Sequence, residues 1–232
     1  MAHELEKENA AAAAMDYVED GMTIGLGTGS TAKFFVEMLA EEMADGLVVR
    51  GVPTSEQTRR QAESLGIPLV DIEQVDRIHL TVDGADEVDD HAQLIKGGGA
   101  ALLREKIIAD ASDLMVVIAD PSKQVEMLGQ FPLPVEVTTF GYTITAKKVY
   151  DALSRSGVLK PRIEVRTGPR HKPIVTDGGN FILDCQCGVI PDAPKTAALL
   201  SYVPGVVEHG LFINKCRVVI IGAEDGATVF EY

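Results

Sequence analysis

Residues 114–119, Leu-Met-Val-Val-Ile-Ala, are apolar at every position. A β-strand with one face in water alternates apolar and polar side chains, so a run without alternation predicts a strand buried on both faces. Such strands are typical of parallel sheets that carry helices on both sides. We therefore expect 114–119 to be a central strand, accompanied by strands at 22–26, 47–50, 78–82 and 217–221.

Segments of helical character separate these strands. Residues 4–19 contain neither Gly nor Pro, and apolar side chains between 34 and 43 recur at helical spacing. Thr54 or Ser55 is expected to cap a helix over 56–65, and a further helix is expected over about 99–110. This alternation predicts an α/β fold: a Rossmann-like, mostly parallel sheet with helices on both faces.

The pattern changes near residues 130–134, Gln-Phe-Pro-Leu-Pro. A strand is expected at 135–139, helices at about 142–155 and 192–202, and two strands around 174–175 and 180–184 that form a hairpin at Asp177-Gly-Gly. The apolar segments after residue 205 are expected to return to the first sheet. We therefore predict a Rossmann-like catalytic domain, residues 1–130 and 206–232, with an inserted α+β lid or oligomerisation domain, residues 131–205.

Composition and charge argue against several classes of function. A net charge of −14 over 232 residues argues against nucleic-acid binding, which needs a basic surface. No apolar run approaches the roughly 18 residues of a membrane span, and the charged N-terminus does not resemble a signal peptide. The three cysteines and five histidines show neither disulfide-framework nor metal-ligand spacing. A cytoplasmic protein without a metal or other cofactor is the expectation.

The segment Gly25-Leu-Gly-Thr-Gly-Ser-Thr31 lies between an expected strand and an expected helix. Glycines allow close backbone approach, and a helix N-terminus favours a phosphate. A dinucleotide fingerprint is not met, because Ser30 replaces its third glycine and Arg50 ends the next expected strand. A phosphate monoester suits the segment better, and a tight turn with a Ser/Thr cap is the alternative.

Four ionisable residues follow the expected strand 78–82 at short intervals: Asp83, Asp86, Lys96 and Glu105. The carboxyl ends of strands in open α/β sheets line the ligand crevice, which the glycine segment should also face. Three glycines, 97–99, follow Lys96. Consecutive glycines cost conformational entropy on folding, and a need for the backbone to approach an oxyanion or a sugar hydroxyl closely would explain them. Turn residues and solvated surface charges are the alternative for each residue alone.

These motifs, in this order and spacing, resemble the type A ribose-5-phosphate isomerases over the whole chain. The matching segments are Gly27-Thr-Gly-Ser-Thr31, Asp83-Gly-Ala-Asp-Glu87, Lys96-Gly-Gly-Gly99 and Ala119-Asp-Pro-Ser-Lys123. The resemblance implies a cofactor-free aldose–ketose isomerase that interconverts D-ribose 5-phosphate and D-ribulose 5-phosphate in the non-oxidative pentose phosphate pathway. It also implies a homodimer or homotetramer with a small-molecule sugar phosphate as its partner.

The resemblance implies distinct roles for the site residues. Glu105 would be the base that moves a proton between C2 and C1, Asp83 would assist ring opening, Lys96 would stabilise the oxyanion, and Asp86 would bind sugar hydroxyls. Substrate-binding positions are then expected at Thr28, Gly29, Ser30, Thr31, Gly84, Ala85, Gly97, Gly98, Gly99, Lys123 and Lys7.

Other readings stay open at this stage. An aminosugar-phosphate deaminase or a CoA-transferase could share the fold, and a sugar-phosphate sensor could share the binding residues. Either end of the substrate could meet the glycine segment. The basic stretch from Arg166 to Lys172 is expected to be a solvated loop or to reach the active site or a neighbouring subunit. Cys185 and Cys187 are expected to be structural.

Overall fold

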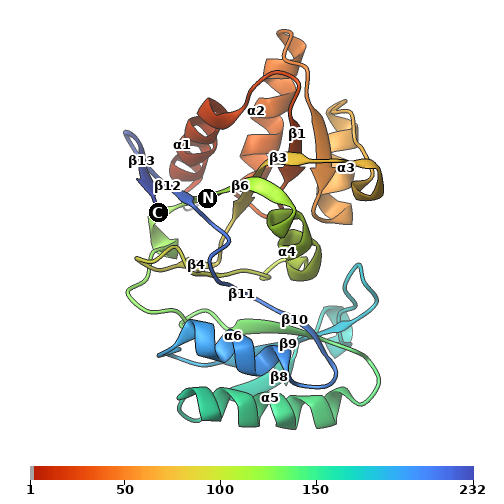
Figure 1. Cartoon of the computed structure of the whole chain (residues 1–232), viewed down its shortest axis with the longest axis vertical. Helices are drawn as coiled ribbons and strands as arrows, with labels where there is room; N and C mark the ends of the chain where they lie inside the picture. Colours follow the sequence, from red (N-terminus) through yellow and green to blue (C-terminus); the bar gives the residue numbers. More distant parts are fainter. Residues whose placement is uncertain (1–2) are drawn as a thin grey trace. The chain divides into compact units, whose positions relative to one another are not determined.

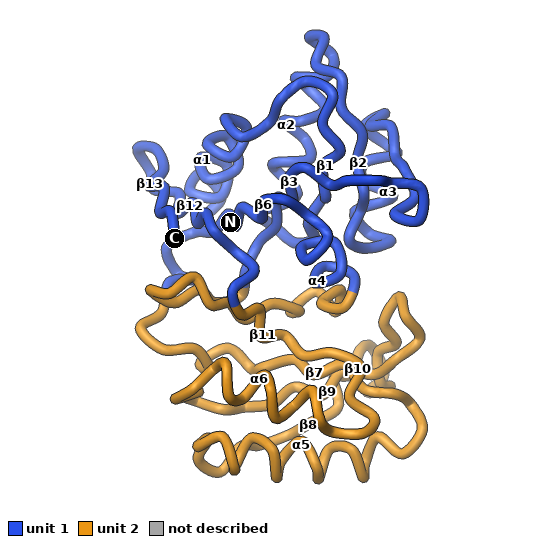
Figure 2. Tube along the Cα trace, viewed as in Figure 1, with its two compact units in different colours: residues 1–85, 104–124, 214–232 blue, residues 86–103, 125–213 orange. Residues whose placement is uncertain are grey.

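The computed structural model describes residues 3–232, which form two compact units (Figure 2). Unit 1 comprises Met1–Ala85, Arg104–Gln124 and Asn214–Tyr232, and unit 2 comprises Asp86–Leu103 and Val125–Ile213. Across residues 3–232, no helix is both long and apolar enough to cross a membrane.

Unit 1 is built on a six-stranded sheet with strand order β13-β12-β6-β3-β1-β2. Its first five strands along the chain run parallel, and β13 pairs antiparallel with β12 at one edge. The predicted central strand is confirmed, because β6 lies between β12 and β3. The strands are β1 (Thr23–Leu26), β2 (Arg50–Pro53), β3 (Ile78–Gly84), β6 (Ser112–Ala119), β12 (Val218–Ala223) and β13 (Gly226–Glu231).

Helices cover both faces of this sheet, as the apolar pattern predicted (Figure 1). Ile24 packs in the large core with α1 (Glu4–Ala14) and α2 (Ala32–Ala44). The next residue, Gly25, faces the other way, towards α4 (Leu102–Asp110): a Cβ atom there would lie 2.7 Å from Ile108 Cγ2. The helix α3 (Glu56–Ser64) follows β2 and is capped by Ser55, one of the two predicted caps, whose hydroxyl accepts from Thr58 N–H.

Unit 2 contains a four-stranded antiparallel sheet of order β10-β7-β9-β8 and a three-stranded sheet of order β11-β5-β4. The helices α5 (Tyr142–Ser156) and α6 (Ala193–Ser201) pack together and share one apolar core with the four-stranded sheet. The strands are β4 (Glu87–Val88), β5 (Leu94–Ile95), β7 (Leu133–Val137), β8 (Arg162–Val165), β9 (Phe181–Gln186), β10 (Val206–His209) and β11 (Leu211–Phe212).

The second strand was predicted three residues too early. Pairing with β1 sets the register, with Gly51 opposite Ile24 and Pro53 opposite Leu26. Gly51 is needed here because a Cβ atom would lie 2.5 Å from Leu26 Cδ1. Proline is tolerated because β2 is an edge strand. Val48, in the predicted strand, is instead two-thirds exposed.

Two predictions in the second half of the chain were also wrong. β9 pairs with β7 and β8 and not with residues 174–175, although Thr176 N–H does bond to Asn180 O (2.9 Å) around the expected turn. β10 pairs with β7 rather than returning to the first sheet. The compact units therefore differ from the predicted domains, because these pairings and the β4-β5-β11 sheet assign residues 86–103, 125–130 and 206–213 to unit 2.

Candidate active site

The glycine segment connects β1 to α2, as predicted. Gly27 lies against Asp83: a Cβ atom at Gly27 would lie 2.4 Å from Asp83 Oδ1 and 2.5 Å from its Cα, so only glycine fits without displacing β3. Gly29 has φ +128° and is exposed, as is Ser30, whereas Thr31 at the N-cap of α2 is buried and makes no side-chain cap hydrogen bond. The segment suits an anion at the N-terminus of α2.

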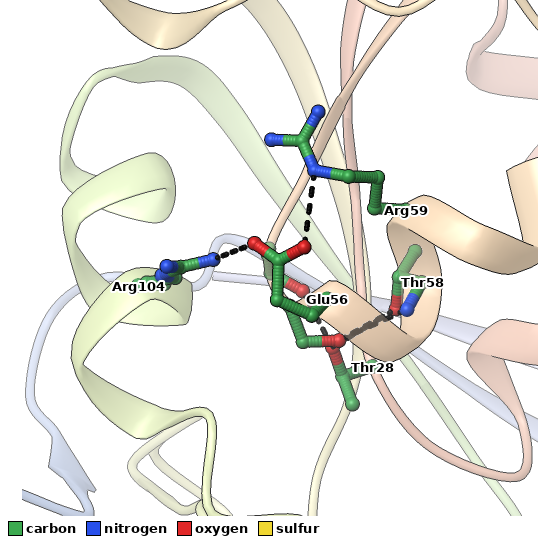
Figure 3. A network of polar contacts seen from close by, with 7 residues as sticks. Thr28, Glu56, Thr58, Arg59 and Arg104 are labelled. Atoms are coloured by element: carbon green, nitrogen blue, oxygen red, sulfur yellow. Dashed lines mark hydrogen bonds and ion pairs between the residues drawn. The ribbon is translucent and has the colours of Figure 1, made fainter. Parts of the chain in front are cut away.

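Thr28 points into a buried cluster of hydroxyl groups (Figure 3). Its Oγ1 lies 2.8 Å from Thr54 Oγ1, 2.7 Å from Ser55 Oγ and 3.0 Å from Thr58 Oγ1. Its backbone N–H donates to Asp83 Oδ1 at 3.0 Å. The side chain thus ties the glycine segment to the start of α3, and the main chain orients the first predicted carboxylate.

An ion pair that sequence reasoning missed continues this network (Figure 3). Arg104 Nη1 donates to Glu56 Oε1 at 2.8 Å, and Arg59 Nε lies 3.4 Å from Glu56 Oε2. The Arg104 guanidinium holds the pKa of Glu56 below its usual range. Because both side chains are more than a third exposed, the pair adds little stability, but it joins α3 to the residue that precedes Glu105.

Asp83 and Glu105 lie on the same face of the unit 1 sheet. Asp83 is inside β3 rather than in the predicted turn, and it is fully buried. It lies two residues beyond Thr81, which pairs with Gly25 under α4, so it faces the same side. Glu105 is in the first turn of α4, not two turns in as predicted, because the helix begins at Leu102. It lies one turn before Ile108 on the sheet-facing side and is 3% exposed.

Asp86, Lys96 and the three glycines belong to unit 2. Lys96 is 2% exposed, and its Nζ lies 5.5 Å from the Phe212 ring centroid, within cation–π range. Gly98 N–H donates to Asp86 Oδ2 at 2.7 Å. Gly97 has φ +105°, and a Cβ atom on Gly98 would lie 2.6 Å from Asp86 Oδ1, so both positions require glycine.

The predicted cationic contacts lie in unit 1. Lys7 Nζ on α1 lies 4.0 Å from Asp120 Oδ2. Asp120 caps the short 3₁₀ helix Pro121–Lys123, accepting from Ser122 N–H at 3.0 Å, and this helix carries Lys123 at its end. Gly84 and Ala85, at the end of β3, are half-buried, and Gly84 N–H donates to Asp83 Oδ1 at 2.7 Å.

Glu87, which ends the second motif, has a structural position that the sequence did not reveal. It is 3% exposed and accepts hydrogen bonds from Gly129 N–H at 2.7 Å and Phe131 N–H at 2.5 Å. Burial raises the pKa of this carboxyl, against the lowering effect of the two amides. Glu87 therefore fixes the loop before β7.

Two further features of the described residues bear on other activities. Within residues 3–232, no group of three or more His, Cys, Asp or Glu side chains could hold a metal ion. A cavity of about 320 Å³ beside α3 and α4 contains none of the predicted site residues, although Glu56 and Arg104 line it. Its other walls are mostly apolar, including Val52, Ile72 and Ile107.

Comparisons with known proteins identify the family of the chain. Residues 50–226 match the family model "Ribose 5-phosphate isomerase A (phosphoriboisomerase A)". The chain is 58% identical over 227 residues to ribose-5-phosphate isomerase A of Maricaulis maris, with 97% of each chain covered. It is similar to the solved ribose 5-phosphate isomerase A of Methanocaldococcus jannaschii (37% identity, TM-score 0.90, 100% of both chains covered). It is also similar to a D-ribose-5-phosphate isomerase solved with phospho-erythronic acid (39%, TM-score 0.92, 99% of both chains covered). The chain belongs to the ribose 5-phosphate isomerase A family.

Proposed function

We propose that Glu105, Asp83, Lys96 and Asp86 together carry out the aldose–ketose isomerisation of this family. The activity itself follows from family membership: the chain is an isomerase that interconverts ribose 5-phosphate and ribulose 5-phosphate. The reaction moves one proton from C2 to C1 through an enediolate, while a proton moves between the two oxygens. It consumes no redox equivalent, so the mechanism needs a base, a group to stabilise the oxyanion and a way to open the furanose ring.

One observation carries the assignment. Asp83, Lys96 and Glu105 are ionisable, yet their exposed fractions are 0%, 2% and 3%. Removing a charged group from water is costly, and a stable fold could place apolar residues at such positions. A requirement for catalysis explains why the chain keeps all three at positions that the resemblance also selects.

Glu105 is the proposed base. It lies in the first turn of α4, on the face that packs over the carboxyl end of β3, where Asp83 lies. A carboxylate withdrawn from water can accept a carbon-bound proton and return it to the neighbouring carbon, a step that contributes about 10²–10⁴-fold. Asp83, held by the N–H groups of Thr28 and Gly84, is the proposed group that exchanges a proton with the ring oxygen.

Lys96 and the following glycines are proposed to stabilise the enediolate oxygens. A buried ammonium group is effective because the local dielectric constant is low. Asp86, which accepts from Gly98 N–H, would bind sugar hydroxyls with its remaining lone pairs. Phospho-erythronic acid, bound in one relative, has a planar anionic carboxylate at the end opposite its phosphate. This group resembles the planar, anionic enediolate, so the compound is a suitable probe here.

The phosphate and the sugar chain are proposed to contact Gly29, Ser30, Thr31, Lys7 and Lys123. A helix N-terminus favours an anion, and Gly29 and Ser30, which precede α2, are exposed. These few local donors must overcome the net charge of −14, which repels a phosphate. Thr28 is proposed to contribute through its N–H bond to Asp83, since its hydroxyl lies among three others.

The chain is further proposed to act in the cytoplasm as a homodimer. Unit 2 exposes large apolar side chains, including Phe140 (92%), Leu159 (85%) and Tyr202 (84%), a pattern typical of surfaces that a second subunit covers. Light scattering should give twice the monomer mass, and Phe140→Ser or Tyr202→Ser should shift it towards the monomer. A wild-type monomer would refute this part of the proposal.

Lys96→Ala tests the proposed chemistry. Loss of an oxyanion-stabilising group should lower kcat by about 10²–10³-fold with a smaller change in KM. A change confined to KM would make Lys96 a binding residue. Direct measurement of ribulose 5-phosphate formation, with circular dichroism to verify folding, distinguishes the two outcomes.

A further inference from the structure

The side chain of Arg166, from the basic stretch with no assigned role, contacts the three-glycine loop of unit 2. Its Nη1 donates to Gly97 O at 2.8 Å and to Gly98 O at 2.9 Å. The same guanidinium grips Asp184 in a bidentate pair: Nε to Oδ2 at 2.9 Å and Nη2 to Oδ1 at 2.5 Å. The guanidinium therefore joins β9 to the loop that follows Lys96.

This pair is well anchored. Arg166 and Asp184 are only 15% and 24% exposed. Arg166 follows β8, and its own backbone is bonded on both sides, N–H to Ile182 O (2.8 Å) and O to Ile174 N–H (3.0 Å). A planar bidentate pair on two paired strands has little freedom, so it can fix the direction of the groups that it contacts.

The contacts determine which way the glycine amides point. In a trans peptide the C=O and N–H groups point in opposite directions. Gly97 O and Gly98 N–H share one peptide, so Gly98 N–H must point away from Arg166, where it meets Asp86 Oδ2 at 2.7 Å. Gly98 O and Gly99 N–H share the next peptide, so Gly99 N–H also points away from Arg166.

We propose that Arg166, held in place by Asp184, is a positioning residue. It directs the Gly98 N–H towards Asp86 and the Gly99 N–H towards the enediolate oxygen. The proposal rests on the proposed role of Lys96 and the glycines. The glycine loop depends on such contacts for a fixed conformation, because three consecutive glycines have the widest conformational freedom when unconstrained. The hydrogen bonds from Arg166 fix the loop from outside. The loop itself could not carry a side chain at Gly98, because Asp86 leaves no room for one.

Arg166→Met is the main test. We expect kcat to fall about 10–100-fold, less than for loss of a direct donor, while KM stays within about threefold. The inhibition constant of phospho-erythronic acid should rise by the same factor as kcat/KM falls. Arg166→Lys keeps the charge but cannot span two carbonyls and a carboxylate, so its kcat should lie closer to that of Arg166→Met than to wild type.

Two controls separate positioning from folding. Arg162→Met removes the same charge from an exposed position at the start of β8 and should leave kcat unchanged. Arg166→Met leaves Asp184 partly buried without its partner, which destabilises the fold, whereas Arg166→Met/Asp184→Leu replaces both charges with apolar groups and should recover thermal stability. Its kcat should remain low.

A folded Arg166→Met variant with kcat within threefold of wild type would overturn the proposal, as would recovery of kcat in the double variant. If Arg166→Met does not fold, the kcat values of the double variant and of Arg166→Lys decide in the same way. Lys96→Ala with full turnover would instead refute the proposed role of Lys96, whatever Arg166→Met shows. The two failures are therefore distinguishable.

Discussion

Thr28→Val tests whether the Thr28 hydroxyl supports the fold or contacts the substrate. Valine matches threonine in shape, so the change removes a hydroxyl without opening a cavity. Thr28 Oγ1 is within 3.0 Å of three other hydroxyl oxygens, which at about 1 kcal/mol per hydrogen bond suggests a loss near 3 kcal/mol. Counting the hydroxyl protons available for these bonds gives a smaller loss of stability.

The four hydroxyls of the cluster carry four protons. Thr54 donates to Leu26 O (2.9 Å) and Thr58 donates to Gly27 O (2.9 Å), and carbonyls cannot donate in return. Only the protons of Thr28 and Ser55 remain for the contacts among the hydroxyls. The Thr28 proton makes one bond, to Ser55 Oγ, so its removal should cost about 1–2 kcal/mol rather than 3.

Urea unfolding measures this cost, and ribulose 5-phosphate formation measures activity. We expect the loss of stability to be accompanied by a kcat/KM within about threefold of wild type, because Thr28 N–H still holds Asp83. Thr31→Val, on the same loop and without a side-chain cap bond, is the matched control and should raise KM with little effect on stability. A hundredfold loss of kcat/KM in Thr28→Val at unchanged stability would refute the reasoning.

Three other predictions concern residues outside this cluster. Gly27→Ala should cost about 1–3 kcal/mol and lower kcat, since the new methyl would displace Asp83; wild-type stability by urea unfolding would contradict the close contact. Burial raises the pKa of Glu87, so the stability linked to its protonation is present below about pH 4.5 and is lost as pH rises through the folded pKa. Glu87→Gln should therefore gain stability relative to wild type as pH rises, and a pH-independent difference would count against it. Burial raises the pKa of Cys187 to about 12 and that of Cys185 well above its usual range, so both thiols should react with a thiol reagent only after unfolding; rapid labelling of the native chain would contradict this.

The sequence predicted those features that depend on local pattern. The apolar run at 114–119 gave the central strand, and Ser55 gave the cap of α3, because burial on both faces and capping leave direct marks on residue type. The register of β2 was not predictable in the same way. It depends on the close contact between Gly51 and Leu26, which lie on different strands.

The site was predicted as a set of residues but not as a geometry. Asp83 was expected in a turn because acidic residues next to glycine favour turns, whereas tertiary packing extends β3 through it. Arg166 and Asp184 lie 18 residues apart, and Arg166 contacts a loop 68 residues earlier. Such contacts arise from strand pairing between distant segments, so no local sequence pattern predicts them.

Glu105→Gln gives the most direct test of the central claim that this carboxylate moves the proton. Glutamine keeps the size of the side chain and removes the base. We expect kcat to fall by at least about 10²-fold, exchange of the C2 proton with deuterated solvent to stop, and phospho-erythronic acid to bind within a few-fold of wild type. Turnover and exchange near wild-type rates in a folded Glu105→Gln variant would contradict the account.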